Sequence, residues 1–146
     1  MMDDLRRQLA RQLKSDEGLV LHAYQDKLSY WTIGYGRLID ERKGGGISEQ
    51  EAEYLLGNDI ERTLRSLEKA LPWVRRLNEP RQGALLNMAF QMGVGGLLGF
   101  EQTLGAIRDE RYAHAAHLML MSKWATQTPR RARKMARQIE TGEWQG

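Results

Sequence analysis

Apolar residues recur at every fourth position near the N-terminus, at Leu5, Leu9 and Leu13. Because their neighbours are polar, this spacing predicts an amphipathic helix over residues 3–14. Gly18 is a stop signal for that helix. We therefore expect Glu17 to lie at the C-terminal end of the helix.

The next stretch has a different pattern and is rich in Tyr, Trp, Thr and Gly. It includes His22 to Tyr24 and Tyr30 to Ile39, and it predicts two or three short antiparallel strands with tight turns. The three glycines at positions 44–46 then predict a flexible loop.

A long helix is predicted over about residues 49–70. Ser48 and Glu51 form a capping-box pair at its start, and Pro72 ends it. About 22 residues at 1.5 Å each give roughly 33 Å, which is long enough to connect two lobes. The apolar positions of this helix are Ala52, Leu55, Leu56, Ile60, Leu64, Leu67 and Leu71.

Residues 83–100 contain no charged side chain, and these 18 positions are near the lower limit for a membrane span. Glycines and polar side chains interrupt the stretch, so we expect a buried helix followed by a turn. Pro80 suits the first turn of that helix. Its buried positions are predicted to be Ala84, Leu85, Met88, Ala89 and Met92.

The rest of the chain is predicted to be helical, with one helix around Tyr112 and another after Thr128. Thr128 is the predicted N-cap of the last helix, and Pro129 is its first residue. One face of this helix is apolar at Ala132, Met135, Ala136 and Ile139. The opposite face is basic, with Arg130, Arg131, Arg133, Lys134 and Arg137.

Together these elements predict an α+β fold in a single domain over residues 1–146. A β-bearing N-terminal lobe is expected over about residues 15–58. A larger helical lobe is expected over about residues 70–146, together with the first helix. The long helix connects the two lobes.

Composition restricts the possible classes of protein. The chain has 146 residues, of which 41% are hydrophobic and 28% charged, as is typical of a soluble globular domain. It contains no cysteine, so disulfides and thiolate metal sites are excluded. His114 and His117 are three positions apart, but no clustered acid completes a metal site beside them. We expect neither a metal nor a cofactor.

Charge is distributed unevenly along the chain. Residues 1–70 contain 11 Lys and Arg against 13 Asp and Glu, whereas residues 71–146 contain 11 against 6. The basic second half favours a polyanionic partner such as nucleic acid, lipid phosphates or an anionic polymer. The small apolar side chains of the last helix favour a helix docked in its lobe with a solvated cationic face. We expect a monomer, with no nucleic acid as partner.

Two carboxylates and a hydroxyl, those of Glu17, Asp26 and Thr32, lie within 16 positions of one another. Such a set can divide the work of glycoside hydrolysis, because one acid protonates the leaving oxygen and a second carboxylate orients water. The spacing alone does not establish this chemistry, since two acids and a nearby hydroxyl occur by chance in most soluble sequences.

The residues around these three groups are more specific. They read Asp16-Glu17-Gly18-Leu19, Tyr24-x-Asp26 and Trp31-Thr32-Ile33-Gly34-Tyr35-Gly36, followed by Leu86 to Gly93, Gly99-Phe100, Lys123-Trp124, Gln127 to Ala132 and Thr141 to Trp144. In these motifs, and in their order, the sequence resembles the phage-type lysozymes of glycoside hydrolase family 24, in particular their T-even branch. The resemblance covers nearly the whole chain, apart from a loop between Leu38 and Ser48 that looks shortened.

The resemblance implies a muramidase that hydrolyses the β-1,4 bond between N-acetylmuramic acid and N-acetylglucosamine in peptidoglycan, with inversion. Glu17 would be the general acid, and Asp26 with Thr32 would hold the attacking water. A lytic transglycosylase acting on the same bond is the alternative, and a non-catalytic protein that binds polyanions is a more distant one. The presence of both Asp26 and Thr32 favours hydrolysis.

Three charged residues would support this chemistry. Arg131 matches the family position whose guanidinium approaches the catalytic Glu. The helix dipole would disfavour an ionised Glu17 and Arg131 would favour it, so the net effect stays open. Arg37 stands where the T-even branch has a His, whose acidic partner matches Asp59. We expect an Arg37–Asp59 ion pair that ties the β-lobe to the long helix with little pH dependence near neutrality.

Four further residues, Leu38, Phe90, Thr103 and Leu118, match saccharide-contacting positions of the family. Thr103 stands where a Ser is usual, and Leu118 stands where an amide side chain can occur. For Leu38 and Phe90, core packing is the open alternative.

The N-terminal residues lack the basic start and the apolar stretch of a signal peptide, and no membrane anchor is visible. We expect an endolysin that is made in the host cytoplasm and reaches the periplasmic murein through a holin-type pore. Its basic last helix is expected to contact anionic groups of the wall or outer-membrane phosphates.

Overall fold

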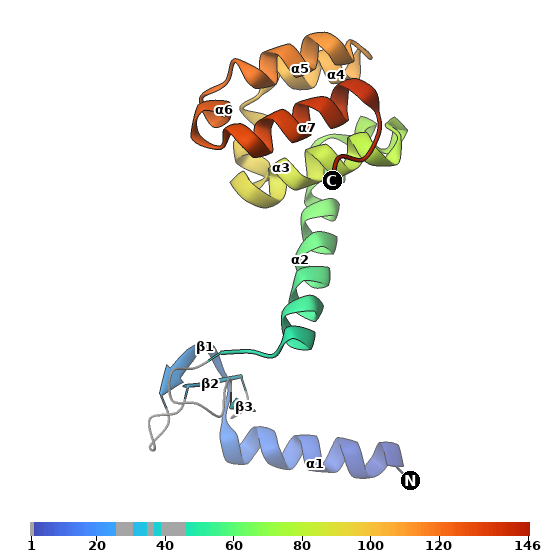
Figure 1. The fold of residues 1–146 in the computed structure, drawn as a ribbon. Helices are drawn as coiled ribbons and strands as arrows, with labels where there is room; N and C mark the ends of the chain where they lie inside the picture. The colour runs from blue at the N-terminus through green and yellow to red at the C-terminus, as the bar shows by residue number, and fades with distance from the viewer. Residues whose placement is uncertain (1, 26–30, 35–36, 39–45) are drawn as a thin grey trace. The chain divides into compact units, whose positions relative to one another are not determined.

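The computed structural model describes residues 2–25, 31–34, 37–38 and 46–146. Its elements are α1 (Met2–Glu17), β1 (Val20–Gln25), β2 (Trp31–Gly34), β3 (Arg37–Leu38), α2 (Glu49–Ala70), the 3-10 helix η1 (Pro72–Arg76), α3 (Glu79–Leu98), α4 (Glu101–Arg108), α5 (Tyr112–Leu120), α6 (Lys123–Gln127) and α7 (Pro129–Thr141) (Figure 1). The described part is mostly helical and has a small antiparallel sheet near its N-terminus. The predicted α+β class is confirmed.

By its internal contacts the chain divides into two compact units, an N-terminal unit (Met1–Leu55) and a C-terminal unit (Leu56–Gly146). Helix α2 begins in the first unit and ends in the second. Its limits agree with the helix predicted over residues 49–70. The predicted lobe boundaries, and the assignment of the first helix to the helical lobe, stay predictions.

The N-terminal unit begins with α1, which is longer at both ends than the predicted helix over residues 3–14. Gly18 ends this helix with a left-handed φ of +72°, and its N–H donates to the carbonyl of Lys14 at 3.1 Å. Glycine adopts this conformation without steric cost, which is why it commonly follows the last helical residue. The predicted stop at Gly18 is confirmed.

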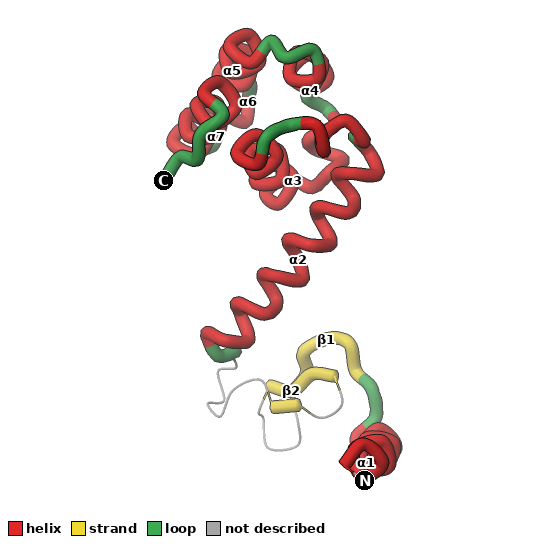
Figure 2. The backbone as a smooth tube through the Cα atoms, turned by 90° about the vertical axis from the view of Figure 1, so that its right-hand side faces the viewer, coloured by secondary structure: helices red, strands yellow, loops and turns green. Residues whose placement is uncertain are grey.

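The three strands form one antiparallel sheet in the order β1-β2-β3, followed in sequence by α2 (Figure 2). Across β1 and β2, Tyr24 pairs with Thr32, and across β2 and β3, Thr32 pairs with Leu38. Thr32 therefore lies on the central strand, between a residue of each neighbour. The predicted region of short antiparallel strands is confirmed for the described residues.

Helix α2 begins with the predicted capping box. The N–H of Ser48 donates to Oε1 of Glu51 at 3.0 Å, and the N–H of Glu51 donates to Oγ of Ser48 at 3.1 Å. Two N–H groups at the helix start, which have no partner inside the helix, are satisfied in this way. A cap of this kind contributes about 1 kcal/mol to helix stability.

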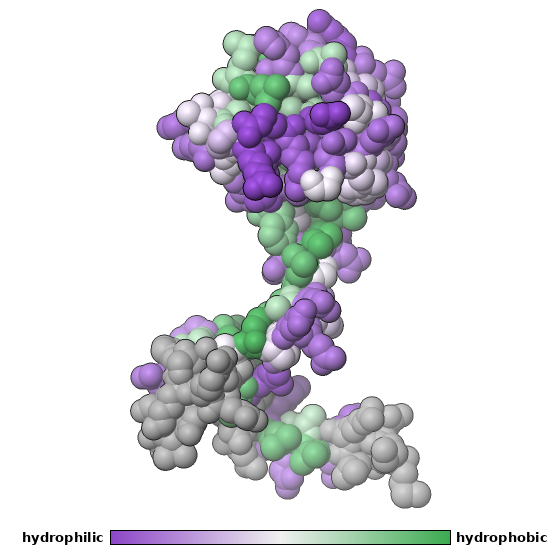
Figure 3. Space-filling model, in the orientation of Figure 1, coloured by the Kyte–Doolittle hydropathy of each residue, from purple (hydrophilic) through white to green (hydrophobic). Residues whose placement is uncertain are grey.

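The C-terminal unit has the main hydrophobic core. Helix α7 packs on α3 and α5, and α4 packs on α5. The largest fully buried side chains include Leu67, Leu85, Met88, Leu97, Ile107, Met119 and Ile139. The surface over α7 is strongly hydrophilic (Figure 3), so this helix contributes one face to the core and the other to the solvent.

The uncharged stretch 83–100 forms most of α3 and the turn after it. Four of its five predicted core positions, Ala84, Leu85, Met88 and Ala89, are buried, which confirms the prediction of a buried helix, whereas Met92 is only partly buried against the core. The backbone leaves helical geometry at Gly93, where φ is 80° and ψ is 156°. Among the described residues, no single helix is long and apolar enough to cross a membrane. Helices α3 and α4 reach the required length and hydropathy only when they are taken together, and the chain bends by 103° between them.

Helix α7 begins at Pro129 with Thr128 as its N-cap residue, both as predicted. Thr128 occupies the N-cap position without a capping hydrogen bond. Its hydroxyl instead donates to the carbonyl of Trp124 at 3.1 Å. The physical reason is that Thr128 also follows the last residue of α6, so its hydroxyl satisfies a carbonyl at the end of that helix.

Candidate active site

Glu17, the predicted general acid, is the last residue of α1. Two residues, Gly18 and Leu19, separate it from β1. The predicted position at the C-terminal end of the first helix is therefore confirmed for its backbone, while its side chain lies outside the described part. Asp26, the predicted second carboxylate, follows β1 and lies outside the described residues.

Thr32, the third predicted catalytic residue, is buried, with 5% of its surface exposed. Residues that face each other across antiparallel strands have their side chains on the same side of the sheet. Tyr24 and Leu38 are its partners, so the three side chains share one face. Leu38 is exposed on the edge strand. The sheet thus brings together a predicted catalytic hydroxyl and a predicted saccharide contact.

Sequence reasoning did not single out Tyr24 as a site residue. The sequence feature that could have pointed to Tyr24 is its position two residues before Asp26, in the segment that resembles the family motif. The register of the sheet, which pairs it with Thr32, could not be read from that motif.

In the C-terminal unit, Phe90 and Arg131 line one hollow of about 380 Å³. Phe90 is 44% exposed, so core packing does not account for it. The Nε of Arg131 donates to Oδ1 of Asn87 at 2.8 Å, and its Nη2 donates to the carbonyl of Asn87 at 3.3 Å. The hollow thus combines an exposed aromatic ring with an oriented guanidinium. The other lining residues are Leu56, Ile60, Gly83, Leu86, Asn87 and Trp144.

Thr103 and Leu118 line a second groove of about 520 Å³ in the same unit. Phe100 and Trp124 form an aromatic wall of this groove, with ring centroids 6.0 Å apart in an edge-to-face arrangement. The four predicted saccharide contacts therefore fall in three places, with Leu38 on the sheet, Phe90 in the hollow, and Thr103 with Leu118 in the groove.

Sequence reasoning did not assign roles to Asn87 and Gln91, which lie on α3. Gln91 accepts a hydrogen bond from Nε1 of Trp124 at 2.9 Å, as Asn87 accepts one from Arg131. The two amides are four residues apart and thus on one face of the helix. This spacing was the available signal, because polar amides are unusual in an otherwise uncharged helical stretch.

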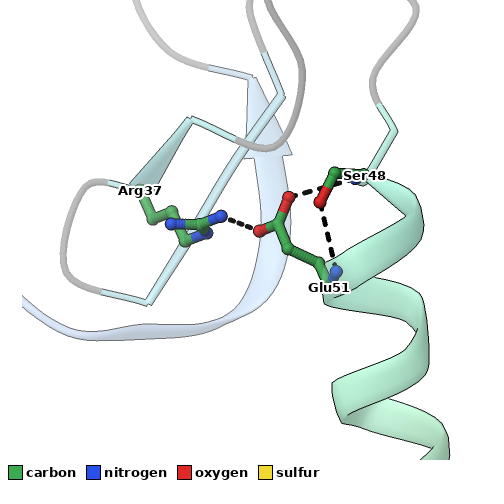
Figure 4. Close-up of polar contacts among 3 residues, drawn as sticks. All are labelled: Arg37, Ser48 and Glu51. Carbon is green, nitrogen blue, oxygen red and sulfur yellow. Dashed lines mark hydrogen bonds and ion pairs between the residues drawn. The ribbon is translucent and has the colours of Figure 1, made fainter.

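Arg37 and Asp59 each have another partner, and the predicted ion pair between them stays a prediction, because Arg37 belongs to the N-terminal unit and Asp59 to the C-terminal unit. Arg37 pairs with Glu51 (Figure 4). Asp59 pairs with Arg62, one helical turn further along α2. Glu51 accepts from Ser48 through Oε1 and from Arg37 through Oε2, so the capping carboxylate also links β3 to α2. Glu51 opens the helix directly after the strand region, whereas Asp59 lies two turns further on and has a partner of its own.

His114 and His117 lie on α5 and are exposed. Within the described ranges, no group of three or more His, Cys, Asp and Glu residues could hold a metal ion.

Comparisons with known proteins identify the family to which the chain belongs. A family model described as phage lysozyme matches residues 14–139. The chain is 33% identical over 156 residues to the probable T4-type lysozyme 1 of Dictyostelium discoideum, covering 89% of this chain and 92% of that protein. It is also 33% identical over 165 residues to the pre-baseplate central spike protein Gp5 of Enterobacteria phage T4, covering 96% of this chain and 29% of that protein.

A third relative, the endolysin of Acyrthosiphon pisum secondary endosymbiont phage 1, is 30% identical over 82 residues, covering 56% of this chain and 55% of that protein. The helical chain with its small antiparallel sheet therefore has a lysozyme-like α+β fold and is a glycoside hydrolase of the lysozyme type. The chain belongs to the phage lysozyme family, and its substrate is peptidoglycan of the bacterial cell wall.

Proposed function

We propose that this lysozyme hydrolyses the β-1,4 bond between N-acetylmuramic acid and N-acetylglucosamine by a single displacement. Glu17 is the general acid, and Asp26 and Thr32 hold the attacking water. The observation that supports this assignment best is the order of elements in the N-terminal unit. Glu17 ends α1 two residues before β1, and Thr32 lies buried on the central strand of the sheet that follows.

In this mechanism the proton of Glu17 moves to the glycosidic oxygen as the bond from that oxygen to the anomeric carbon breaks. The water held by Asp26 and Thr32 attacks the anomeric carbon from the opposite face and gives up a proton to Asp26. One displacement inverts the configuration, so the first product has the α configuration. The side chains of Leu38, Phe90, Thr103 and Leu118 bind the glycan, and Arg131 supports the acid.

Product mass distinguishes hydrolysis from the alternative, lytic transglycosylation, in which a hydroxyl of the muramic acid replaces water. We expect the enzyme to release hydrated muropeptides from purified peptidoglycan. Mass spectrometry without prior borohydride reduction measures this, because an anhydro product lacks one water. Anhydro muropeptides as the main product would contradict the proposal and establish a transglycosylase.

The cellular role that we propose is that of an endolysin in phage release. Synthesis in the host cytoplasm and action on the periplasmic murein follow from that role. The similarity to the phage endolysin supports it. The similarity to Gp5, a central spike protein of a phage baseplate, supports a tail component as the alternative.

We also propose that the basic face of α7 contacts anionic groups of the cell envelope. Arg130, Arg133, Lys134 and Arg137 are exposed on this face. Within the described part of the chain, none of the four forms an ion pair with an acidic side chain. Their charges are therefore available to an external polyanion.

Reversing two of these charges, in Arg133→Glu with Lys134→Glu, is expected to weaken binding to purified peptidoglycan sacculi about fivefold or more at low salt. The difference should disappear near 1 M salt, where the screening length is about 3 Å. Cosedimentation measures the bound fraction, and vesicles that contain lipopolysaccharide replace the sacculi in a parallel assay to separate wall from outer-membrane phosphates. Arg65→Glu with Lys69→Glu on α2 is the control with the same change in charge. Equal weakening by the control pair would contradict a role of the α7 face.

A further inference from the structure

Asn87 of α3 holds the guanidinium of Arg131 along one edge. Its Oδ1 accepts from Nε of Arg131 at 2.8 Å, and its backbone carbonyl accepts from Nη2 at 3.3 Å. The two residues are 44 positions apart in sequence, and both are partly buried. A guanidinium held at two points along one edge is fixed in orientation, because the group is planar and its donors form a rigid fork.

The other edge of the same guanidinium remains available. Among the residues that the structure describes, none accepts a hydrogen bond from Nη1 of Arg131. Arg131 lines the apolar hollow next to Phe90 and Trp144, where partial burial lowers the local dielectric constant. A charged donor in such a place binds an anionic group more strongly than the same donor in bulk water.

The holding group is an amide rather than a carboxylate. An Asp at this position would form the same hydrogen bond but would neutralise the charge of Arg131. Asn87 accepts through a neutral oxygen. The full positive charge of Arg131 therefore stays available to an anionic group that binds the open edge of the guanidinium. The Asn87 amide therefore orients the guanidinium of Arg131 without neutralising its positive charge.

We propose that Asn87 is a positioning residue of the reaction, which acts by orienting the open edge of Arg131 toward an anionic group formed or used during bond cleavage. The inference rests on the proposed function, in which Arg131 supports the catalytic acid. Asn87 lines the same hollow as Arg131, and we expect it to act on the reaction through the orientation of the guanidinium. Its contribution therefore exists only while Arg131 is present.

A double-mutant cycle tests this dependence. Asn87→Ala is expected to lower kcat about 10- to 100-fold, because a misplaced guanidinium no longer meets the developing charge, and to change KM less than twofold. In the Arg131→Ala background, adding Asn87→Ala should cause no further loss of kcat. Kinetics are measured on soluble peptidoglycan fragments, and thermal unfolding is recorded for each variant.

A second variant separates orientation from charge. Asn87→Asp keeps an oxygen acceptor at the same position but neutralises the guanidinium, so kcat should fall although the contact with Arg131 is retained. Asn58→Ala, an exposed Asn on α2, is the matched control and should keep the kcat of the wild type.

Equal losses from Asn87→Ala with and without Arg131 would overturn the proposal and assign Asn87 a purely structural role. Full activity of Asn87→Asp would also overturn it. Failure of the proposed function gives a different result, because Glu17→Gln would then remain active. If Arg131→Ala alone keeps full kcat while Glu17→Gln is inactive, the role of Glu17 as general acid stands, whereas the supporting role of Arg131 and this inference both fail.

Discussion

Replacing Glu17 by Gln is expected to lower kcat on peptidoglycan about 10²- to 10⁴-fold, the usual contribution of a general acid. Gln has the shape of the protonated acid but has no acidic proton to give to the leaving oxygen. Because Glu17 is the last residue of α1 and Gly18 ends that helix independently of it, the fold should be preserved. Turbidity loss of purified sacculi measures the rate, and circular dichroism measures the fold.

Glu53→Gln on α2 is the matched control for this variant. It makes the same chemical change at an exposed glutamate of the N-terminal unit and should keep the wild-type rate. A Glu17→Gln enzyme with more than about a tenth of wild-type activity would be inconsistent with general-acid catalysis by this residue. The acid would then have to be sought among the other carboxyl groups of the chain.

The second large effect concerns the C-terminal end of α7. Nε of Arg81 donates to the carbonyl of Ile139 at 2.7 Å, and its Nη2 donates to that of Glu140 at 3.1 Å. The Arg81 guanidinium also lies 3.6 Å from the centre of the Tyr112 ring. The last carbonyls of a helix have no hydrogen-bond partner inside the helix, and they carry partial negative charge. A cation that donates to them therefore stabilises the helix end both by hydrogen bonding and by electrostatic attraction.

Gly142 ends the helix beside this arginine. Its φ of 69° and ψ of 24° are left-handed, and its carbonyl accepts from Nδ2 of Asn78 at 3.0 Å. A methyl group added at Gly142 would lie 2.8 Å from Cζ and Nη1 of Arg81 and 2.8 Å from Nδ2 of Asn78. These atoms would have to move, and the hydrogen bonds donated by Nε and Nη2 of Arg81 and by Nδ2 of Asn78 would weaken.

Gly142→Ala is therefore expected to lower the free energy of unfolding by about 2–4 kcal/mol. About 1–2 kcal/mol of this comes from the left-handed backbone, and the rest comes from the displaced charged hydrogen bonds. Urea unfolding followed by tryptophan fluorescence measures the change, since Trp124 and Trp144 both lie in the C-terminal unit.

The same substitution at Gly57 is the control. Gly57 lies inside α2, and a methyl group added there would meet nothing within 4 Å. Gly57→Ala should raise the free energy of unfolding by about 0.5–1 kcal/mol, because alanine is the better helix former. Equal stability of Gly142→Ala and the wild type would show that the contacts of Arg81 and Asn78 do not stabilise the end of α7.

Several features of the fold could be predicted because their signals lie within one or two helical turns. The capping pair Ser48 and Glu51 starts α2, Gly18 ends α1, and Pro129 starts α7, each as expected. The apolar spacing of Ala132, Met135, Ala136 and Ile139 predicted a buried face, which the core confirms. In these cases the backbone conformation at a helix end, and the spacing of apolar side chains along a helix, depend only on residues that are close in sequence.

The sequence did not determine the hydrogen-bond partner of a side chain where two local partners compete for it. Thr128 is the N-cap residue of α7, but its hydroxyl donates to a carbonyl of the preceding helix. Arg37 was assigned to Asp59 by resemblance, yet it pairs with Glu51 at the start of α2. A sequence shows which groups can form a bond, and the choice among available partners depends on distances that only folding determines.

The family, the α+β class and the position of Glu17 at a helix end could be read from the sequence alone, since motif order and hydrophobic period are local properties of the chain. Tertiary structure alone brought Arg131 to Asn87 and Trp124 to Gln91, across 44 and 33 positions. It also separated Phe90 from the groove of Thr103 and Leu118. Such pairings arise when packed helices bring distant side chains within hydrogen-bonding distance, and no periodicity along the chain encodes that distance.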